Sequence, residues 1–316
     1  MKSNIKIPKL YIMVGLSASG KSTIAKRIAE AEDCIIVSSD VIRGEICEGG
    51  VADQSKNEEV FKIFHKRIRE NLRSGHNVIA DATNITIKSR TAIFEAIRRI
   101  ECYPIAYVVP KKIEDCLLDN ISSERMHSVP DEVIYKQRGK FQVPFYEEGF
   151  KEIIIHKFRN ETVDSNFLTD CYNQMKGFDQ KNPHHNMDLY AHSDFVKKKF
   201  LAMSNYAWLI YGTGASLHDV GKLFTQTFDE SGIAHYYQHE NVGAYYLLSN
   251  LESAKLHRDY SDEEYLEILF LINYHMMPFN WNNQKVHKKW NKVFGEEKYK
   301  MLLDFHECDK MRYWHK

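Results

Sequence analysis

A glycine-rich turn near the amino terminus contains the residue types that bind nucleotide phosphates. The stretch Gly15–Ser22 reads Gly-Leu-Ser-Ala-Ser-Gly-Lys-Ser and fits the pattern GxxxxGK(S/T), between an apolar run and a helix-like stretch. Its glycines would let backbone N–H groups curl around phosphate oxygens, and Lys21 would reach the β- and γ-phosphates while Ser22 ligates Mg²⁺. We therefore expect ATP or another nucleoside triphosphate to bind with Mg²⁺ at Gly15, Ser17, Ala18, Ser19, Gly20, Lys21, Ser22 and Thr23.

Polar residues follow the next two apolar runs, at the sheet edge where open α/β folds bind ligands. Asp40 comes after the run Cys34–Val37, and Arg43 follows three residues later on the same helical face. Asp40 could accept the proton of an attacking hydroxyl, or it could simply cap a helix. Asp81 and Asn84 follow the third run, where contact with an acceptor competes with a plain turn role.

A kinase also needs an arginine that neutralises the developing charge and a segment that closes over the site. The polar stretch 122–130 contains Arg125, which we choose for this role, with Arg138 as the reserve. An ordinary surface arginine is the alternative for both.

The second half contains histidines and aspartates that several helices could bring together. Histidine nitrogens mixed with carboxylate oxygens suit octahedral Mn²⁺, Fe²⁺, Co²⁺ or Ni²⁺ better than a tetrahedral structural zinc. His239 and His275 could hold a second ion, which would allow a two-metal site, whereas any one of these histidines alone would more often be structural. The predicted ligands are His192, His218, Asp219, His239, His275 and Asp309.

The elements that must position these residues differ between the two halves. Short apolar runs at Leu10–Val14, Cys34–Val37, Asn77–Asp81, Tyr103–Val109 and Ile153–Ile155 alternate with amphipathic stretches, which predicts a mainly parallel sheet with flanking helices. Beyond residue 186 the apolar residues follow helical spacing, which predicts an all-α region. We expect domains over 1–158 and 183–316, joined by a polar linker over 159–182.

Composition limits the function classes. At 316 residues the chain is long enough for two domains, and its 43 basic and 43 acidic residues give a net charge of zero. Zero net charge argues against a protein that coats nucleic acid by charge alone, but not against an enzyme that grips one end. The six cysteines contain no CxxC pair, and the first residues are too polar for a signal or membrane segment, so we expect a cytoplasmic protein without membrane contact.

The first half resembles the 5′-hydroxyl polynucleotide kinases of bacteriophage and of bacterial end-healing enzymes, over about residues 8–157. The resemblance implies that Asp40 is the general base on the 5′-OH and that Arg43 holds the adjacent phosphate of the acceptor. It also implies that Asp81 contacts the acceptor and that Arg125 acts on the donor phosphates. The motifs that carry it are Gly15–Ser22, Ser39-Asp40-Val-Ile-Arg43, Ile79-Ala-Asp81-Ala-Thr83-Asn84 and the Arg125 segment.

The histidine and aspartate series resembles the HD phosphohydrolase superfamily over about residues 183–316. The stretch from Asn182 to His192, and the later His239-Glu followed by Gly-Ala, are similar to the HD domains of some CCA-adding tRNA enzymes. This resemblance implies hydrolysis of a phosphomonoester or a 2′,3′-cyclic phosphate by water activated at the metal. Lys222 would neutralise the substrate phosphate.

Two modules with opposite phosphate chemistry suggest one molecule that serves both. Our first hypothesis is nucleic-acid end healing, in which 5′-OH ends are phosphorylated with ATP and 2′,3′-cyclic phosphate or 3′-phosphate ends are hydrolysed. RNA or DNA ends would be the substrates, and a separate polynucleotide ligase would join the products. The alternative is a small-molecule or nucleoside kinase fused to an HD nucleotidase, and a third hypothesis is a nucleotide-sensing regulator.

Overall fold

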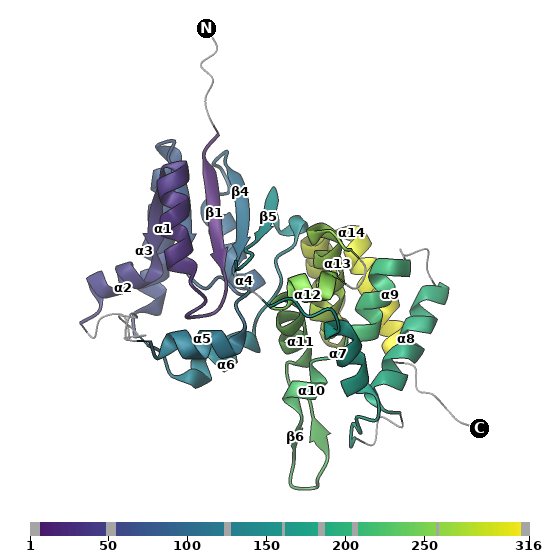
Figure 1. Cartoon of the computed structure of the whole chain (residues 1–316). Coiled ribbons are helices and arrows are strands. Elements are labelled where there is room, and N and C mark those ends of the chain that lie inside the picture. Colours follow the sequence, from purple (N-terminus) through teal and green to yellow (C-terminus); the bar gives the residue numbers. More distant parts are fainter. Residues whose placement is uncertain are drawn as a thin grey trace. The chain divides into compact units, whose positions relative to one another are not determined.

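The computed structural model describes residues 7–48, 55–122, 128–159, 162–182, 187–203, 208–256 and 259–310 (Figure 1). These residues divide into two compact units. The first contains the described residues up to Arg138 together with Pro144–Phe158. The second contains Gly139–Val143 together with the described residues from Arg159 onward.

The first unit is built on a parallel five-stranded sheet in the order β2-β3-β1-β4-β5. Strand β3, between β2 and β1, is buried at every residue, which is the pattern of a parallel strand covered by helices on both faces. The strands are β1 (Lys9–Val14), β2 (Cys34–Ser38), β3 (Asn77–Asp81), β4 (Tyr103–Val108) and β5 (Glu152–Ile155).

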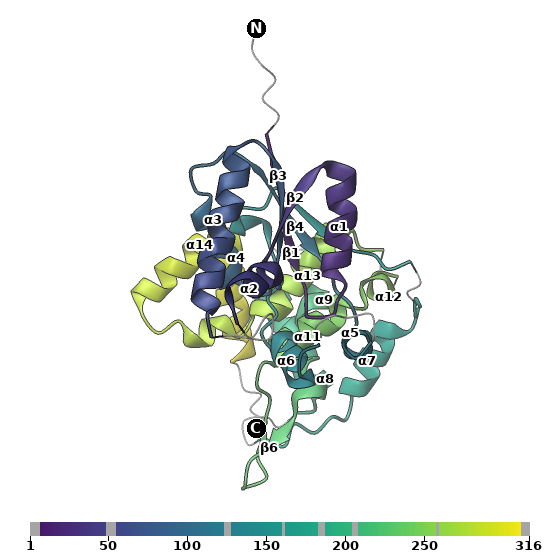
Figure 2. The same cartoon turned by 90° about the vertical axis from the view of Figure 1, so that its left-hand side faces the viewer.

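Helices cover this sheet, and α1 and α3 flank the strands on either side in Figure 2. In α3 the residues Val60, Phe64, Ile68 and Leu72 recur every four positions and are all buried, so one apolar stripe fastens this helix. The helices of the unit are α1 (Lys21–Glu32), α2 (Ser39–Ile46), α3 (Asn57–Arg73), α4 (Ile87–Ala96), α5 (Ile113–Asn120), α6 (Asp131–Arg138) and the 3-10 turn η2 (Tyr146–Glu148).

The second unit is helical and surrounds α13, in which every residue from Ile268 to Tyr274 is buried. A helix that is buried on all sides is the expected centre of such a bundle. Its elements are α7 (Phe167–Met175), α8 (Leu189–Met203), α9 (Trp208–Leu217), α10 (Lys222–Thr225), β6 (Thr227–Phe228), β7 (Ala234–His235), α11 (His239–Leu248), α12 (Leu251–Lys255), α13 (Asp262–Tyr274), η3 (Met277–Asn280) and α14 (Gln284–Asp309).

The fold class predicted from the sequence is confirmed: an α/β kinase-like unit with a parallel sheet is followed by a helical region. The all-α expectation missed one feature, the antiparallel hairpin of β6 and β7, because strands of two residues leave no periodic signal. None of the described helices is both long enough and apolar enough to span a membrane.

Two parts of the chain differ from the expected domain boundaries. Residues 159–182, expected as a linker, contain α7, whose residues Phe167, Leu168, Cys171 and Met175 are buried in the second unit. The helix α7 is only nine residues long and is surrounded by polar residues, so the helical spacing of its apolar residues was not evident from the sequence.

The segment Gly139–Val143, expected within the first domain, also belongs to the helical unit. Asn273 of α13 donates to the Phe141 carbonyl at 3.1 Å and accepts from the Val143 N–H at 2.6 Å. The Tyr274 hydroxyl donates to the Val143 carbonyl at 2.6 Å. These bonds satisfy backbone groups that would otherwise be buried without partners, so they hold the segment in place.

Candidate active sites

The glycine-rich turn connects β1 to α1 and has the backbone shape that a phosphate cradle requires. Gly20 has φ 88° and Ala18 has φ 62°, both in the left-handed region. A Cβ on Gly15 would lie 2.8 Å from the Val109 carbonyl oxygen, so only glycine fits there. The turn therefore leads its backbone N–H groups into the start of α1, where the helix dipole favours an anion.

The side chains of the turn are arranged around Lys21, which is buried although it is charged. Its ammonium donates to the Leu16 carbonyl and lies 3.4 Å from Ser19 Oγ. The Ser22 hydroxyl donates to Asp81 Oδ2 at 2.9 Å. Asp81 thus lies beside the residue predicted to ligate Mg²⁺, and burial raises the pKa of its carboxyl, which Lys21 and Ser22 oppose.

The residues predicted to handle the acceptor have different surroundings. Asp40, in the first turn of α2, is exposed and near enough to Asp81 to raise the pKa of that carboxyl further. Arg43, on the same helix, is only 4% exposed. The Asn84 amide is buried and donates to the Met13 carbonyl at 2.9 Å, so the structure gives Asn84 a role in holding the turn.

Of the two arginines considered for the closing segment, Arg138 lies within the described residues. Arg125 lies outside the described residues. Arg138 ends α6, and its guanidinium lies 5.5 Å from the centre of the Tyr135 ring.

A glutamine that sequence reasoning missed contacts the phosphate turn. Gln137 of α6 accepts from the Ser17 N–H at 2.7 Å and donates to Ser17 Oγ at 3.0 Å. The two residues are 120 positions apart, and no local pattern marks a glutamine in a helix as a partner for a distant turn. Gln137 fixes the backbone at the third position of the motif.

All six metal ligands predicted in the second half of the chain come together in the helical unit. His192 Nε2 lies 3.2 Å from Asp309 Oδ1, and His218 Nε2 lies 3.3 Å from Asp219 Oδ2. His239 Nε2 lies 3.0 Å from Asp219 Oδ1 and 3.3 Å from His275 Nε2. We call this set the His/Asp cluster; it comprises His192, His218, Asp219, His239, His275 and Asp309.

Backbone carbonyls orient three of the imidazoles. Nδ1 of His218, His239 and His275 each lies 2.8 Å from a carbonyl oxygen three residues earlier in the chain. A proton on Nδ1 that is donated to this carbonyl leaves the Nε2 lone pair free and pointing into the cluster, as in histidines that bind metals.

Asp219 lies at the centre and uses its two oxygens in different directions. Oδ2 is close to His192 and His218, whereas Oδ1 is close to His239 and His275. One subset of ligand atoms therefore includes His192, His218 and Asp219, and another includes Asp219, His239 and His275. This geometry fits one cation or two cations that share Asp219.

The electrostatics of the cluster favour bound positive charge. Burial opposes ionisation of both carboxyls. Lys222, His218 and His239 nevertheless hold the pKa of Asp219 well below the usual range, and His192 and His218 do the same for the pKa of Asp309. Burial also lowers the pKa of His218, yet the two carboxylates raise it to about 10. His218 Nε2 is buried and lies 3.3 Å from Asp219 Oδ2 without a well-directed hydrogen bond to any described group, so a metal ion between such atoms would satisfy it.

Two glycines let the elements of the cluster approach one another. A Cβ on Gly221 would lie 1.9 Å from the His239 carbonyl oxygen, and one on Gly243 would lie 2.8 Å from the Gly221 nitrogen. The turn that follows His218 and Asp219 therefore packs directly on the backbone of α11. Any side chain at position 221 would push Asp219 away from His239.

Lys222, predicted to neutralise the substrate phosphate, contacts a carboxylate of the cluster. Its ammonium is buried, lies 2.7 Å from Asp219 Oδ2 and donates to Gln180 Oε1 at 2.9 Å. In the absence of substrate, the positive charge of Lys222 therefore stabilises the ionised carboxylate of Asp219. Gln180, a buried residue 42 positions away, helps to hold the Lys222 ammonium in place, and the sequence did not indicate this role.

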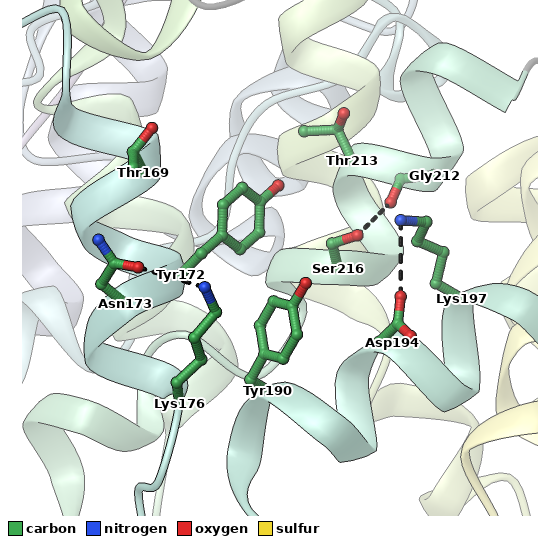
Figure 3. A pocket seen from close by; sticks show the side chains of 10 residues that line it. All are labelled: Thr169, Tyr172, Asn173, Lys176, Tyr190, Asp194, Lys197, Gly212, Thr213 and Ser216. Carbon is green, nitrogen blue, oxygen red and sulfur yellow. Dashed lines mark hydrogen bonds and ion pairs between the residues drawn. The ribbon is translucent and has the colours of Figure 1, made fainter.

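A separate polar cavity of about 220 Å³ lies between α7, α8 and α9 (Figure 3). No residue that lines it belongs to the His/Asp cluster. Its two lysines face partners within the lining, since Lys176 donates to Asn173 at 3.3 Å and Lys197 lies 3.8 Å from Asp194. The other lining residues include Tyr172, Tyr190, Thr213 and Ser216.

Comparisons with solved structures give weak likenesses. Two chains from Pnkp1/Rnl/Hen1 RNA repair complexes align with 26% and 22% identity and TM-scores of 0.38 and 0.33, covering 43% and 51% of this chain. This chain spans about half the length of those two, 45% and 51%. A gluconokinase from Sinorhizobium meliloti 1021 aligns with 17% identity and a TM-score of 0.36, over 49% of this chain and 85% of its own. Because all three TM-scores are below 0.5, these likenesses decide nothing about fold or function.

The comparison with protein families concerns the first unit. Residues 10–144 match the family described as AAA domain, which is less than half of the chain. None of the curated proteins matches. The matched residues include the phosphate turn, Asp40, Asp81 and, apart from Lys9, strands β1 to β4 of the sheet. The family match and the P-loop motif therefore both support a kinase-like P-loop fold for the first unit.

Proposed function

We propose that this chain heals nucleic-acid ends, with two active sites of opposite phosphate chemistry. The first unit transfers the γ-phosphate of ATP to a 5′-hydroxyl. The helical unit, as an HD-type phosphohydrolase, removes a 3′-phosphate or opens and removes a 2′,3′-cyclic phosphate. A separate ligase could then join the resulting 5′-phosphate and 3′-hydroxyl ends.

The observation that carries this proposal is the convergence of the His/Asp cluster. Four imidazoles and two carboxylates from distant parts of the helical unit point their ligand atoms at one another. A structural histidine needs only one partner, so four in one buried place need another explanation. A divalent cation bound there would polarise a phosphate and lower the pKa of a water molecule.

The residues of the chain have defined tasks in this hydrolysis. The carbonyls behind His218, His239 and His275 set the imidazole orientation, and Lys222 keeps Asp219 ionised and in place. Low exposure throughout the cluster limits competition from bulk water and strengthens each charge interaction.

In the kinase-like unit, Asp40 is the proposed general base. Because it is exposed at the carboxyl end of β2, it can accept the proton as the 5′-oxygen attacks the γ-phosphorus. The bond from the γ-phosphorus to the bridging oxygen breaks, and ADP leaves. Lys21 would stabilise the phosphate oxygens, and Ser22 would hold Mg²⁺ beside Asp81.

The test is an RNA oligonucleotide with a 5′-hydroxyl and a 2′,3′-cyclic phosphate, incubated with the full chain, labelled ATP, Mg²⁺ and Mn²⁺. We expect label at the 5′ end and loss of the cyclic phosphate. Lys21→Met should stop only the first reaction and Asp219→Ala only the second. If purified, metal-loaded protein modified neither end, the proposal would be wrong.

The burial of Arg43 supports a second candidate. An arginine that is 4% exposed is poorly placed to hold the adjacent phosphate of a polynucleotide acceptor. A nucleoside or another small hydroxyl compound needs no such contact, so a small-molecule kinase fused to an HD nucleotidase is the alternative. Transfer of label to free nucleosides but not to oligonucleotides would favour it.

A further inference from the structure

The hairpin of β6 and β7, taken here with the two residues Tyr236 and Tyr237 that follow it, exposes aromatic rings next to the His/Asp cluster in the chain. Tyr237 is 73% exposed and Phe228 is 53% exposed, although a small hairpin gains nothing in stability from rings in water. Figures 1 and 2 both show the hairpin extending away from the helices of its unit. Exposed rings on a projecting element suggest a contact with a ligand.

The rings are held in fixed orientations before any ligand binds. The rings of His235 and Tyr237 are parallel within 4°, with centroids 5.6 Å apart. Asp229 Oδ2 lies 3.1 Å from His235 Nε2, and Asp229 Oδ1 accepts from the Ser231 and Ile233 N–H groups. A single aspartate therefore fixes both the turn and the imidazole that supports Tyr237.

The base of the hairpin is fastened to residues that serve the cluster. Tyr236 donates to the Gln180 carbonyl at 2.6 Å, and its own carbonyl lies 2.8 Å from His239 Nδ1. The Lys222 ammonium lies 5.4 Å from the centre of the Tyr236 ring. Tyr236 thus faces the groups that orient the cluster while its neighbour Tyr237 faces solvent.

The charges of the hairpin select among possible ligands. Its turn carries Asp229 and Glu230, so it would repel rather than attract a phosphate backbone. A flat ring system with little charge on its face, such as a nucleobase, can stack on Tyr237 or Phe228 without this penalty. The Lys181 ammonium lies 5.7 Å from the centre of the Phe228 ring.

We propose that the hairpin is a stacking platform for the nucleobase next to the phosphate that the His/Asp cluster hydrolyses. This inference rests on the proposed phosphohydrolase function and narrows its substrates to esters that carry a base. The base could belong to a polynucleotide end or to a free nucleotide, and the stacking chemistry is the same for both.

The kinetic test compares Tyr237→Leu, Tyr237→Trp and the matched control Phe279→Leu in the full chain. Phe279 is also exposed, at 47%, but lies in η3. The substrates are RNA with a 3′-phosphate, a nucleoside 3′-monophosphate and glycerol 2-phosphate, which has no base. We expect Tyr237→Leu to lower the preference for base-bearing esters, as the ratio of kcat/KM values, by about tenfold through KM. Tyr237→Trp and Phe279→Leu should keep the preference.

An equal ratio in wild type and Tyr237→Leu would overturn the platform. A loss confined to the oligonucleotide would support a polynucleotide end, and a loss confined to the mononucleotide would support a free nucleotide. Dissociation of a dimer by Tyr237→Leu, with the ratio unchanged, would overturn the proposal in favour of a second copy of the chain.

A binding measurement separates failure of the platform from failure of the proposed function. Fluorescence anisotropy with a labelled RNA that ends in a 3′-hydroxyl needs no hydrolysis, and an RNA with an abasic 3′ end is its control. If no ester is hydrolysed, weaker binding of the intact RNA by Tyr237→Leu would still support the platform. Identical binding of both RNAs by wild type and variant would contradict it.

Discussion

The phosphate turn and the His/Asp cluster are built in opposite ways. The turn is eight consecutive residues, and it presents mainly backbone N–H groups between one strand and one helix. The cluster contains side chains that are up to 117 positions apart, and apart from the adjacent His218 and Asp219 each is placed by the packing of a different part of the helical unit. A local change can therefore damage the turn, whereas distant packing changes can damage the cluster.

The largest effect should come from the residue at the centre of the cluster. Asp219→Ala removes the two oxygens by which Asp219 contributes to both ligand subsets. Bound metal and phosphohydrolase activity should therefore fall by about 10³-fold or more. Metal analysis by mass spectrometry and an assay on 3′-phosphate RNA would measure this. Phosphorylation of 5′-hydroxyl ends is the internal control. Its parallel loss in a folded protein would mean that the two sites do not act independently.

A comparable loss should occur in the first unit alone when the turn loses its cation. Lys21→Met keeps the length of the side chain but removes the positive charge on the phosphates, so kinase turnover should drop by about 10³-fold. Transfer of labelled phosphate to a 5′-hydroxyl oligonucleotide gives the measurement. Metal content and hydrolysis should stay at wild-type values, and a change in either would contradict the comparison.

A smaller effect, on stability, should show how closely the cluster depends on packing. Gly221→Ala places a Cβ 1.9 Å from the His239 carbonyl oxygen, and we expect a destabilisation of about 3 kcal/mol with weaker metal binding. Gly212→Ala is the matched control, because among the described residues its Cβ would meet only Leu201 Cδ1 at 3.4 Å. Calorimetric unfolding of both variants measures the difference. Equal stabilities would mean that α11 moves freely relative to Gly221.

The smallest expected effect concerns the strap formed by Gly139–Val143. Asn273→Ala leaves the buried Val143 N–H and Phe141 carbonyl without their partner, at a cost of about 2 kcal/mol. Because His275 lies two residues away, metal affinity should fall by a few fold as well. Asn291→Ala on the exposed face of α14 should change neither quantity, and equal behaviour of the two variants would argue against a supporting role for the strap.

The sequence predicted most of the first unit because its signals are local. The buried strand at 77–81 has the predicted bounds, and the phosphate turn lies between a strand and a helix as the motif requires. Arg43 and Asn84 show the limit of such reasoning. Their positions in the chain indicated the sheet edge, but only the surrounding packing determined that both are buried.

The sequence indicated the side chains of the His/Asp cluster but not the groups that hold these side chains in place. The residue types suggested metal ligands, whereas Gln180 and the carbonyl of Tyr236 act through contacts that have no sequence signature. In the first unit, the contact of Gln137 with Ser17 of the phosphate turn likewise has no sequence signature. The hairpin was missed because two-residue strands are too short for alternation to appear.

The strap also decides what a protease would release. A cut after Phe158 severs the chain at the apparent boundary, yet residues 139–143 stay covalently attached to the amino-terminal fragment. Phe141 would remain packed on Tyr245, with ring centroids 4.9 Å apart, and Tyr274 would keep its bond to Val143. The two pieces should therefore co-purify as a nicked complex, and the helical part expressed alone would lack a piece of its own interior.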